Sequence, residues 1–312
     1  MIYTVTMNPS LDYVVGVEGF CEGVVNRTAR EALMPGGKGI NVSLMLHHLG
    51  APATALGFLA GFTGEEIRRA LHEREIPEDF LFVENRISRI NVKLKSAKET
   101  EINGMGPRIE KKDTERLLAQ MEKLICKGDT VVISGSLPHG LNASVYTEII
   151  LLAKEKGAAV FADVSGKLLE AVLPYRPFLV KPNHHELGEY FGCEIRSAKE
   201  AAFYAEKLRE KGAQNVMVSL AEKGAVLVTE QGVYFAEAPK GEVVNSVGAG
   251  DSSVGGFLFG FLQDHDFETA LAFAVAAGSA TAFSEGIAER AQVLALLEQV
   301  NVQRKGAWKI SF

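Results

Sequence analysis

Short apolar or β-branched runs alternate with helical patterns along most of this chain of 312 residues. This alternation limits the fold more than any other feature, because parallel strands need crossover connections and those are usually helices. It predicts an α/β protein whose central sheet is mostly parallel. A chain of this length allows one large α/β domain, or one such domain with a smaller attachment.

The pattern predicts strands at 2–7, 54–60, 130–134, 158–163, 178–181, 215–220, 225–229 and 232–236, and helices at 38–49, 64–75, 110–126, 142–156, 166–173, 184–191, 197–211, 250–263, 267–284 and 288–299. Two stretches, 13–33 and 86–103, break the alternation with strand-like pieces in which apolar and polar residues alternate. Together they predict a small β-sheet that extends from the main domain, either as a lid over a site or as a plain exposed hairpin.

Composition narrows the class of protein. The 33 Lys and Arg are outnumbered by 39 Asp and Glu, which gives a net charge of −6. We therefore expect no nucleic acid and no membrane surface as a partner, and an anionic ligand must meet a local positive site. Cys21, Cys126 and Cys193 lie far apart without metal-ligand spacing, which fits a cytoplasmic protein. The most apolar window, 269–283, is interpreted as a buried helix.

The strongest local signal is NSVGAGDSSVGGF, residues 245–257. Gly248, Ala249 and Gly250 precede an apolar helical run, so their N–H groups can point together at an anion from a helix N-terminus. Asp251 could act there as a general base on a hydroxyl group. The alternative is that Asp251 caps the helix while the glycines only make a turn. Neither a Walker A loop nor a Rossmann fingerprint fits, so phosphate binding would need another architecture.

Two N-terminal segments could bind a polar ligand. In PGGKGIN, residues 35–41, Gly36 and Gly37 let a ligand approach the backbone closely, and Lys38 could present an ammonium group to it. A glycine-rich turn with a solvated lysine explains the same residues. Asp12, in VTMNPSLD, follows a strand at the end where open α/β sheets bind ligands, and it could accept two sugar hydroxyl hydrogen bonds. A turn-forming aspartate is the alternative.

A fourth segment, LVKPNHHELGEYFG, places Asn183 and Glu186 in the first turn of a helix. The pair could hold a hydrated Mg²⁺, and it could equally form a capping box; the two interpretations are compatible. His184 and His185 are adjacent and lack the spacing of metal ligands. The segment GSLPHG lacks the G-x-S-x-G nucleophile elbow, so no serine nucleophile is indicated.

In this order the segments resemble the ribokinase-like carbohydrate kinases, also called the phosphofructokinase B family. GGKGIN and VGAGDS look like that family's two signatures, and RINVK, ETEINGMGP and KPNHHELGEYFG extend the resemblance to essentially the whole chain. The resemblance implies a three-layer α/β/α fold in which residues 1–312 form a single domain. Its central sheet would be mostly parallel, with a small β-sheet lid made by about 13–33 and 86–103. It also implies ATP and Mg²⁺ as cofactors.

The resemblance also implies roles for individual residues. Asp251 looks like the catalytic base, the backbone of Gly248, Ala249 and Gly250 like the anion hole, and Asn183 with Glu186 like the Mg²⁺ pair, acting partly through water. The substrate-binding residues would be Asp12, Gly37, Lys38, Asn41, Arg89, Lys93 and Asn103, of which Lys38 and the last three are the candidates for an existing substrate phosphate. The ATP-binding residues would be Lys181, Asn183, Ser219, Gly224, Ser279 and Phe283.

The positions of Arg89 and Lys93 indicate which kind of sugar the protein would bind. They are four residues apart, so they face the same side of a strand and two cations would converge there, unless both are simply solvated. The pair favours a substrate that already carries a phosphate. The motifs look most like the branch of the family that phosphorylates D-fructose 1-phosphate at its 6-hydroxyl, with tagatose 6-phosphate as the competing substrate.

Other classes of protein stay open. A non-catalytic sugar-phosphate sensor would not need the anion hole and Asp251 together, and a nicotinamide-dependent oxidoreductase is disfavoured because the Rossmann fingerprint is missing. Exposed strand edges of the lid could pair between two copies of the chain and form a homodimer.

Overall fold

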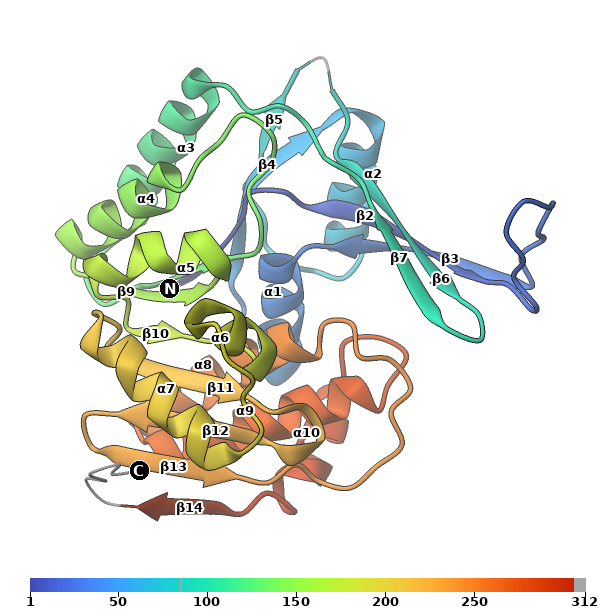
Figure 1. The fold of residues 1–312 in the computed structure, drawn as a ribbon. Helices are drawn as coiled ribbons and strands as arrows, with labels where there is room; N and C mark the ends of the chain where they lie inside the picture. Colours follow the sequence, from blue (N-terminus) through green and yellow to red (C-terminus); the bar gives the residue numbers. More distant parts are fainter. Residues whose placement is uncertain (85, 306–312) are drawn as a thin grey trace.

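The computed structural model describes residues 1–84 and 86–305, and Figure 1 shows a layered main body from which a second, smaller sheet projects. In this described part of the chain the main sheet has ten strands in the order β14-β13-β12-β11-β10-β9-β8-β1-β4-β5. Their bounds are β1 (Ile2–Thr6), β4 (Thr54–Ala60), β5 (Leu81–Val83), β8 (Thr130–Ser134), β9 (Ala159–Asp163), β10 (Leu179–Val180), β11 (Asn215–Ser219), β12 (Ala225–Thr229), β13 (Gly232–Ala236) and β14 (Val302–Lys305).

The sheet is parallel from β5 to β11, whereas β12, β13 and β14 add to its edge as an antiparallel meander. The central strands β1 and β8 are buried along their whole length, because helices cover both faces of the sheet. In β8, Val131 and Ile133 enter one hydrophobic core while Val132, which points the other way, enters the second. The expected mostly parallel α/β sheet is therefore confirmed.

Helices form the outer two layers (Figure 1). One core packs under α3 (Lys111–Leu124), α4 (Ser144–Glu155), α5 (Gly166–Val172), α6 (His184–Phe191) and α7 (Ala198–Glu210). The opposite face packs against α1 (Lys38–Leu49), α2 (Gly61–His72), α8 (Ala249–Asp264), α9 (Phe267–Ala282) and α10 (Arg290–Leu297). Short 3₁₀ turns lie at Leu173–Tyr175 and Ala221–Lys223. The expected helix at 269–283 is α9, which is largely buried, and no described helix is long and apolar enough to cross a membrane.

The small sheet has the order β3-β2-β6-β7, from β2 (Ser10–Gly16), β3 (Arg30–Gly36), β6 (Arg89–Lys95) and β7 (Glu99–Asn103). Its two faces differ in chemistry, as the alternation predicts. One row across the sheet reads Leu33, Tyr13, Val92 and Ile102, and the neighbouring row on the other face reads Met34, Asp12, Asn91 and Asn103. The polar rows face the main body, so they can contribute to a site there.

Candidate active site

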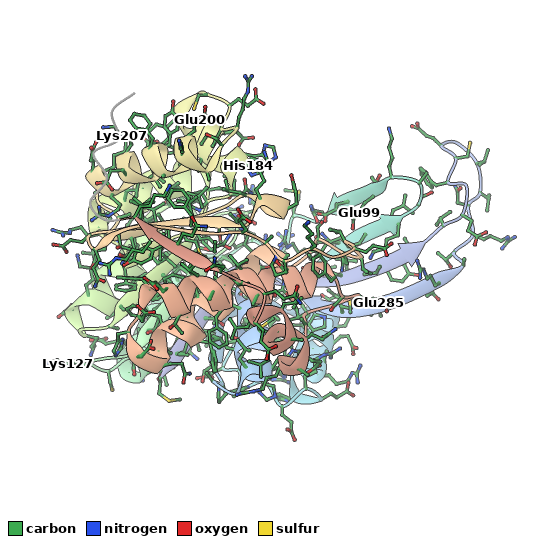
Figure 2. All side chains as sticks on the ribbon, turned by 90° about the horizontal axis from the view of Figure 1, so that it is seen from below. Glu99, Lys127, His184, Glu200, Lys207 and Glu285 are labelled. Atoms are coloured by element: carbon green, nitrogen blue, oxygen red, sulfur yellow. The ribbon has the colours of Figure 1, made fainter. Side chains whose placement is uncertain are left out.

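The site lies where the small sheet meets the carboxyl ends of the parallel strands. Glu99 from β7 and Glu285 from the main body face this junction (Figure 2). Two helix N-termini also point there, those of α1 after Gly37 and of α8 after Gly248. Open α/β sheets bind ligands outside the carboxyl ends of their strands, so the topology itself selects this junction.

Asp251 lies in the first turn of α8 and is only 7% exposed. Gly248 caps the helix with φ of 80°, and a Cβ there would come within 2.6 Å of the Ile287 Cδ1 atom. The N-terminal N–H groups of α8 are thus presented by a backbone that only glycine adopts easily next to Ile287. The Asn41 side-chain amide donates a 2.8 Å hydrogen bond to Asp251 Oδ2.

The environment of Asp251 suits a general base. Burial, followed by the negative charge of Asp163, raises the pKa of the Asp251 carboxyl to about 6. Lys38, the Asn41 hydrogen bond and Lys181 act in the opposite direction. A base with this pKa is mostly ionised at neutral pH and still accepts a proton more readily than an ordinary aspartate.

Asp163, at the end of β9, joins two cations and was not identified by sequence reasoning. Its Oδ2 lies 3.3 Å from the Lys38 ammonium, and its Oδ1 lies 3.3 Å from the ammonium of Lys181, which follows β10. Burial alone would raise the pKa of Asp163, but the two ammonium groups outweigh it and hold that pKa below its usual range. The available signal was an acidic residue ending a buried strand, which no motif marks.

Asp12 is held in place by its neighbours in the small sheet. The Ser10 hydroxyl donates to Asp12 Oδ1 at 2.6 Å, and the Asn91 amide donates to the same oxygen at 2.8 Å. A Cβ on Gly36 would come within 2.7 Å of the Asp12 carboxylate, so glycine is required beside it. Oδ2 of Asp12 therefore remains available for a ligand.

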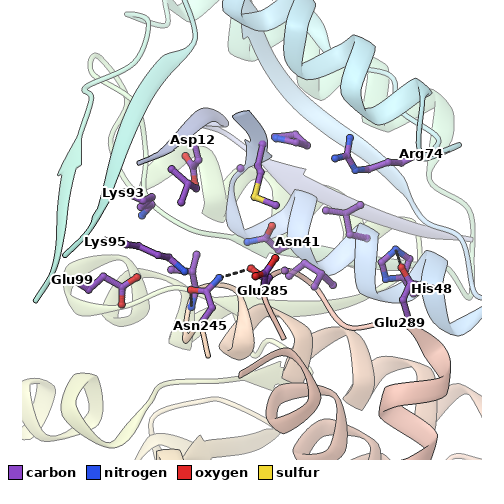
Figure 3. Close-up of a pocket in the computed structure, with 18 residues that line it drawn as sticks. Asp12, Asn41, His48, Arg74, Lys93, Lys95, Glu99, Asn245, Glu285 and Glu289 are labelled. Atoms are coloured by element: carbon purple, nitrogen blue, oxygen red, sulfur yellow. Dashed lines mark hydrogen bonds and ion pairs between the residues drawn. The ribbon is translucent and has the colours of Figure 1, made fainter. Parts of the chain in front are cut away.

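Asp12 and Asn41 line a cavity of about 310 Å³ together with Lys93 and Lys95. Figure 3 shows Asp12 and Lys93 toward the small sheet, Asn41 near the middle, and Arg74 at the far end. Lys93 is buried and pairs with Glu101 of β7 at 2.7 Å, so this cation is partly neutralised.

A second cavity, of about 270 Å³, lies on the other side of the α1 N-terminus. It is lined by Lys38, Arg89, Asp163 and Glu186, among others. Thr6, Asn8 and Ser134 also line this cavity, and their atoms Thr6 Oγ1, Asn8 Oδ1 and Ser134 Oγ are buried without a hydrogen-bond partner among the described residues. Buried polar atoms are nearly always satisfied, so these three favour a polar ligand or water in this cavity.

Arg89 and Lys93 lie on the same face of β6, as expected from their spacing, and both lower the pKa of Glu101 against the raising effect of its burial. They nevertheless line different cavities, because Arg89 turns toward the main body and donates to the Asn8 carbonyl at 3.0 Å. Strand periodicity predicts the face of a side chain but not the direction of a long one beyond its Cβ.

Asn183 and Glu186 form the capping box of α6. The Asn183 Oδ1 atom accepts from the Glu186 N–H at 2.8 Å, and Glu186 Oε2 accepts from the Asn183 N–H at 2.9 Å. No three His, Cys, Asp or Glu side chains gather as a metal cluster within residues 1–84 and 86–305. The donor set still fits Mg²⁺, because Glu186 keeps a second oxygen on the wall of the cavity and Mg²⁺ usually retains several waters.

The remaining candidate residues lie apart from both cavities. Ser219 ends β11 and bridges to Asn183, which places it next to the capping box. Gly224 has φ of 92°, and a Cβ there would collide with the Ala236 carbonyl, so its glycine is required by the backbone alone. Ser279 and Phe283 are half-buried at the end of α9. Their role in binding ATP, like that of exposed Asn103, stays a prediction.

The fold and the site define the class of protein. The chain belongs to the pfkB family of carbohydrate kinases, because the sequence pattern of that family matches residues 5–292. The fold is therefore ribokinase-like, as expected, and the protein is a sugar kinase.

Individual relatives are similar over nearly the whole chain. The 1-phosphofructokinase of Bacillus subtilis is 49% identical, with 97% of this chain and 100% of that protein covered. The D-tagatose-1-phosphate kinase of Bacillus licheniformis is 37% identical, with 97% and 99% covered. Among solved structures, phosphofructokinase-2 from Escherichia coli in complex with fructose-6-phosphate superposes with a TM-score of 0.89 at 29% identity, covering 96% of this chain and 98% of that one.

Proposed function

We propose that this chain transfers the γ-phosphoryl group of ATP to the 6-hydroxyl of D-fructose 1-phosphate, giving fructose 1,6-bisphosphate and ADP. The observation that carries the proposal is the buried Asp251 carboxylate at the N-terminus of α8, beside a cavity that also holds Asp12 and Asn41. In this proposal Asp251 is the general base and the N-terminus of α8 binds the transferred group, next to the cavity that Asn41 lines. The similarity to the Bacillus subtilis enzyme supports the particular sugar.

In this reaction Asp251 accepts the proton of the sugar hydroxyl as the oxygen attacks the γ-phosphorus. The bond from that phosphorus to the bridging oxygen breaks, and ADP leaves. The N–H groups at Gly248, Ala249 and Gly250 stabilise the charge on the transferred group, which is where most catalysis of phosphoryl transfer arises. Mg²⁺, held through Glu186 and water, would neutralise charge on the ATP phosphates.

The sugar would bind between the two sheets. Asp12 has one free carboxylate oxygen for sugar hydroxyls, while Gly37, Lys38 and Asn41 supply a closely approachable backbone, a cation and an amide. For the phosphate already on the sugar, Arg89 and Lys38 share the cavity with the unpartnered polar atoms, whereas Lys93 is occupied by Glu101. This favours Arg89 and Lys38 over Lys93 and Asn103 as the main phosphate ligands.

Two coarser features accompany this proposal. A cytoplasmic location is supported by three free cysteines, of which Cys21 and Cys126 are exposed. A homodimer through the small sheet is supported by its outward apolar row, which includes exposed Leu33 and Ile102.

The substrate is tested by ADP release in a coupled assay across fructose 1-phosphate, fructose 6-phosphate, tagatose 1-phosphate, tagatose 6-phosphate and ribose. We expect the highest kcat/KM for fructose 1-phosphate, since specificity is the ratio of these values. A higher value for either tagatose phosphate would move the chain to a tagatose kinase, which the similarity to the Bacillus licheniformis enzyme makes the second candidate. Binding of a sugar phosphate without ATP turnover would instead indicate a sensor.

A further inference from the structure

The most buried carboxylate of the site has no role in the reaction described above. Asp163 is 2% exposed, lies at the end of β9, and touches neither the helix end nor the sugar cavity that holds Asp12. A charged group in such a position is costly unless it is paired. Its two partners, Lys38 and Lys181, come from different elements, α1 and the segment after β10.

The two lysines lie beside the reacting groups. Lys181 is 4% exposed, and its ammonium nitrogen is 3.4 Å from where a Cβ of Gly250 would be, which places it at the N-terminus of α8. Lys38 lines the second cavity, and its charge also acts on Asp251. Without a carboxylate between them, two ammonium groups this close would repel each other and Lys181 would be a buried, unpaired charge.

We propose that Asp163 is a positioning residue whose carboxylate holds Lys38 and Lys181 beside the N-terminus of α8. This inference rests on the proposed kinase reaction.

The charges of these four side chains explain how the arrangement would act. Two lysines and two aspartates carry no net charge together while all are ionised. When Asp251 takes the hydroxyl proton, the group gains one net positive charge as the phosphoryl group moves to the sugar oxygen. With Asp163 ionised, the four side chains therefore carry no net charge before the reaction. The net positive charge forms only during the transfer, when it can stabilise the moving phosphoryl group.

The groups that act on Asp251 come from β9, α1 and the segment after β10. Asp163 of β9 favours its protonated form, while Lys38 and Asn41 of α1 and Lys181 after β10 favour the ionised form. Glu186 of α6 acts on this set through Lys38, whose pKa it helps to raise after the larger effect of Asp163. Removing only the charge of Asp163 leaves two unopposed ammonium groups near Asp251, so the pKa of Asp251 should fall.

The test is Asp163→Asn, which keeps the shape of the side chain and removes its charge. We expect kcat at pH 8 to fall about 100-fold, the effect of misplacing catalytic groups by roughly 1 Å, and the acidic limb of kcat/KM to move to lower pH. Asp163→Glu keeps the charge but displaces it, so kcat should fall while the acidic limb stays near that of the wild type. An ordinary structural defect would not move the limb in one variant and leave it in the other.

Asp129→Asn is the matched control. Asp129 is also buried, and it pairs with the N-terminal amine at 2.7 Å, but it precedes β8 and so lies at the amino ends of the parallel strands, whereas Asp163 lies at the carboxyl end of β9. It should leave kcat and the acidic limb unchanged.

A second readout needs no substrate. The Tm difference between the wild type and Asp251→Asn, followed against pH, reports the titration of Asp251, and its midpoint should move to lower pH in the Asp163→Asn background. Wild-type kcat in Asp163→Asn, or an unmoved limb and midpoint, would overturn the inference. A wild-type protein that turns over no sugar phosphate would overturn the proposed function instead.

Discussion

At the scale of single residues, the burial of Asp251 acts on folding as well as on chemistry. Its pKa lies at about 6 instead of the ordinary 3.8, so the folded state binds this proton more readily than the unfolded state does. The contribution of this group to stability is therefore complete below about pH 4 and is lost as pH rises through about 6. The asparagine in Asp251→Asn cannot ionise, so this variant does not lose stability as the pH rises through about 6.

We predict that Asp251→Asn lowers kcat by at least about 100-fold, the usual contribution of a general base. The same variant should be more stable than the wild type at pH 8, by about 1–3 kcal/mol, with the gain vanishing near pH 4. Steady-state kinetics and urea unfolding at the two pH values measure these effects. A near-wild-type rate would remove Asp251 from the role of base.

The pH dependence of the wild type is a separate prediction. Because Asp251 must be ionised to accept a proton, kcat/KM should decline as pH falls below about 6. An enzyme whose base had the ordinary aspartate pKa of 3.8 would keep its rate down to a pH about two units lower. A kcat/KM profile from pH 4.5 to 8, with unfolding followed in parallel by circular dichroism, separates loss of the ionised base from loss of the fold.

Sequence reasoning could propose Asp251 and Gly248 as candidates because both belong to one contiguous motif at a helix start. It did not find Asp163, whose partners Lys38 and Lys181 are distant along the chain and meet only when β9, β10 and α1 are assembled. A motif carries the chemistry of one turn of chain, whereas a bridging ion pair depends on the topology of the sheet.

At the scale of elements, the start of α8 depends on a glycine. Gly248→Ala would place a methyl group 2.6 Å from Ile287 in a backbone with φ of 80°. We predict that this variant loses at least about tenfold in kcat, because misdirected N–H groups no longer stabilise the transferred phosphoryl group.

Gly128→Ala provides the control for Gly248→Ala. Gly128 has φ of 89°, nothing lies within 4 Å of the Cβ position, and it precedes β8, away from the site. Both variants carry a similar backbone strain, so both should lower Tm, but only Gly248→Ala should lower kcat. Equal kcat values in the two variants would contradict an anion hole at α8.

Strand β6 allows a comparison between the two cavities. Arg89→Ala should raise KM for fructose 1-phosphate more than KM for ATP, and Lys93→Ala should do so less, because Glu101 already pairs with Lys93. Initial rates with each substrate varied in turn measure the effects, with Arg68→Ala as the control, because Arg68 pairs with Glu65 within α2. A uniform effect on both substrates would remove Arg89 from the phosphate site.

Most elements were predictable because their periodicity is strong. Strands β5 and β14 were not, since Leu81–Val83 has only three residues and the sequence VQRK of β14 has no apolar alternation. Both lie at edges of the sheet, where pairing with one neighbour is enough to hold a strand that its own sequence does not specify.

At the scale of the whole molecule, alternation predicted the α/β class but not the strand order. The order places β1 between β4 and β8, and this brings the ends of β1, β8 and β9 together under the small sheet. That the chain is one domain, with the small sheet acting as its lid, stays a prediction. It is supported by α2, which packs against strands of both sheets.

The outward face of the small sheet carries an exposed apolar row. One row of side chains on this face reads Leu33, Tyr13, Val92 and Ile102. The two residues at its ends are exposed, Leu33 to 54% and Ile102 to 64%. An apolar row on a sheet whose edges are also open favours burial against a second copy of the chain. We therefore expect a dimer in sedimentation velocity.

The double variant Leu33→Lys, Ile102→Lys should convert that dimer to a monomer, because charged side chains would have to be desolvated at the interface. Leu151→Lys is the control, since Leu151 on α4 is 51% exposed but lies on the main body. Because the same strands carry Asp12 and Arg89 on their other face, loss of the partner should also loosen the sugar site. KM for fructose 1-phosphate should then rise in the double variant and stay unchanged in Leu151→Lys, whereas a dimer that survives both lysines would place the interface elsewhere.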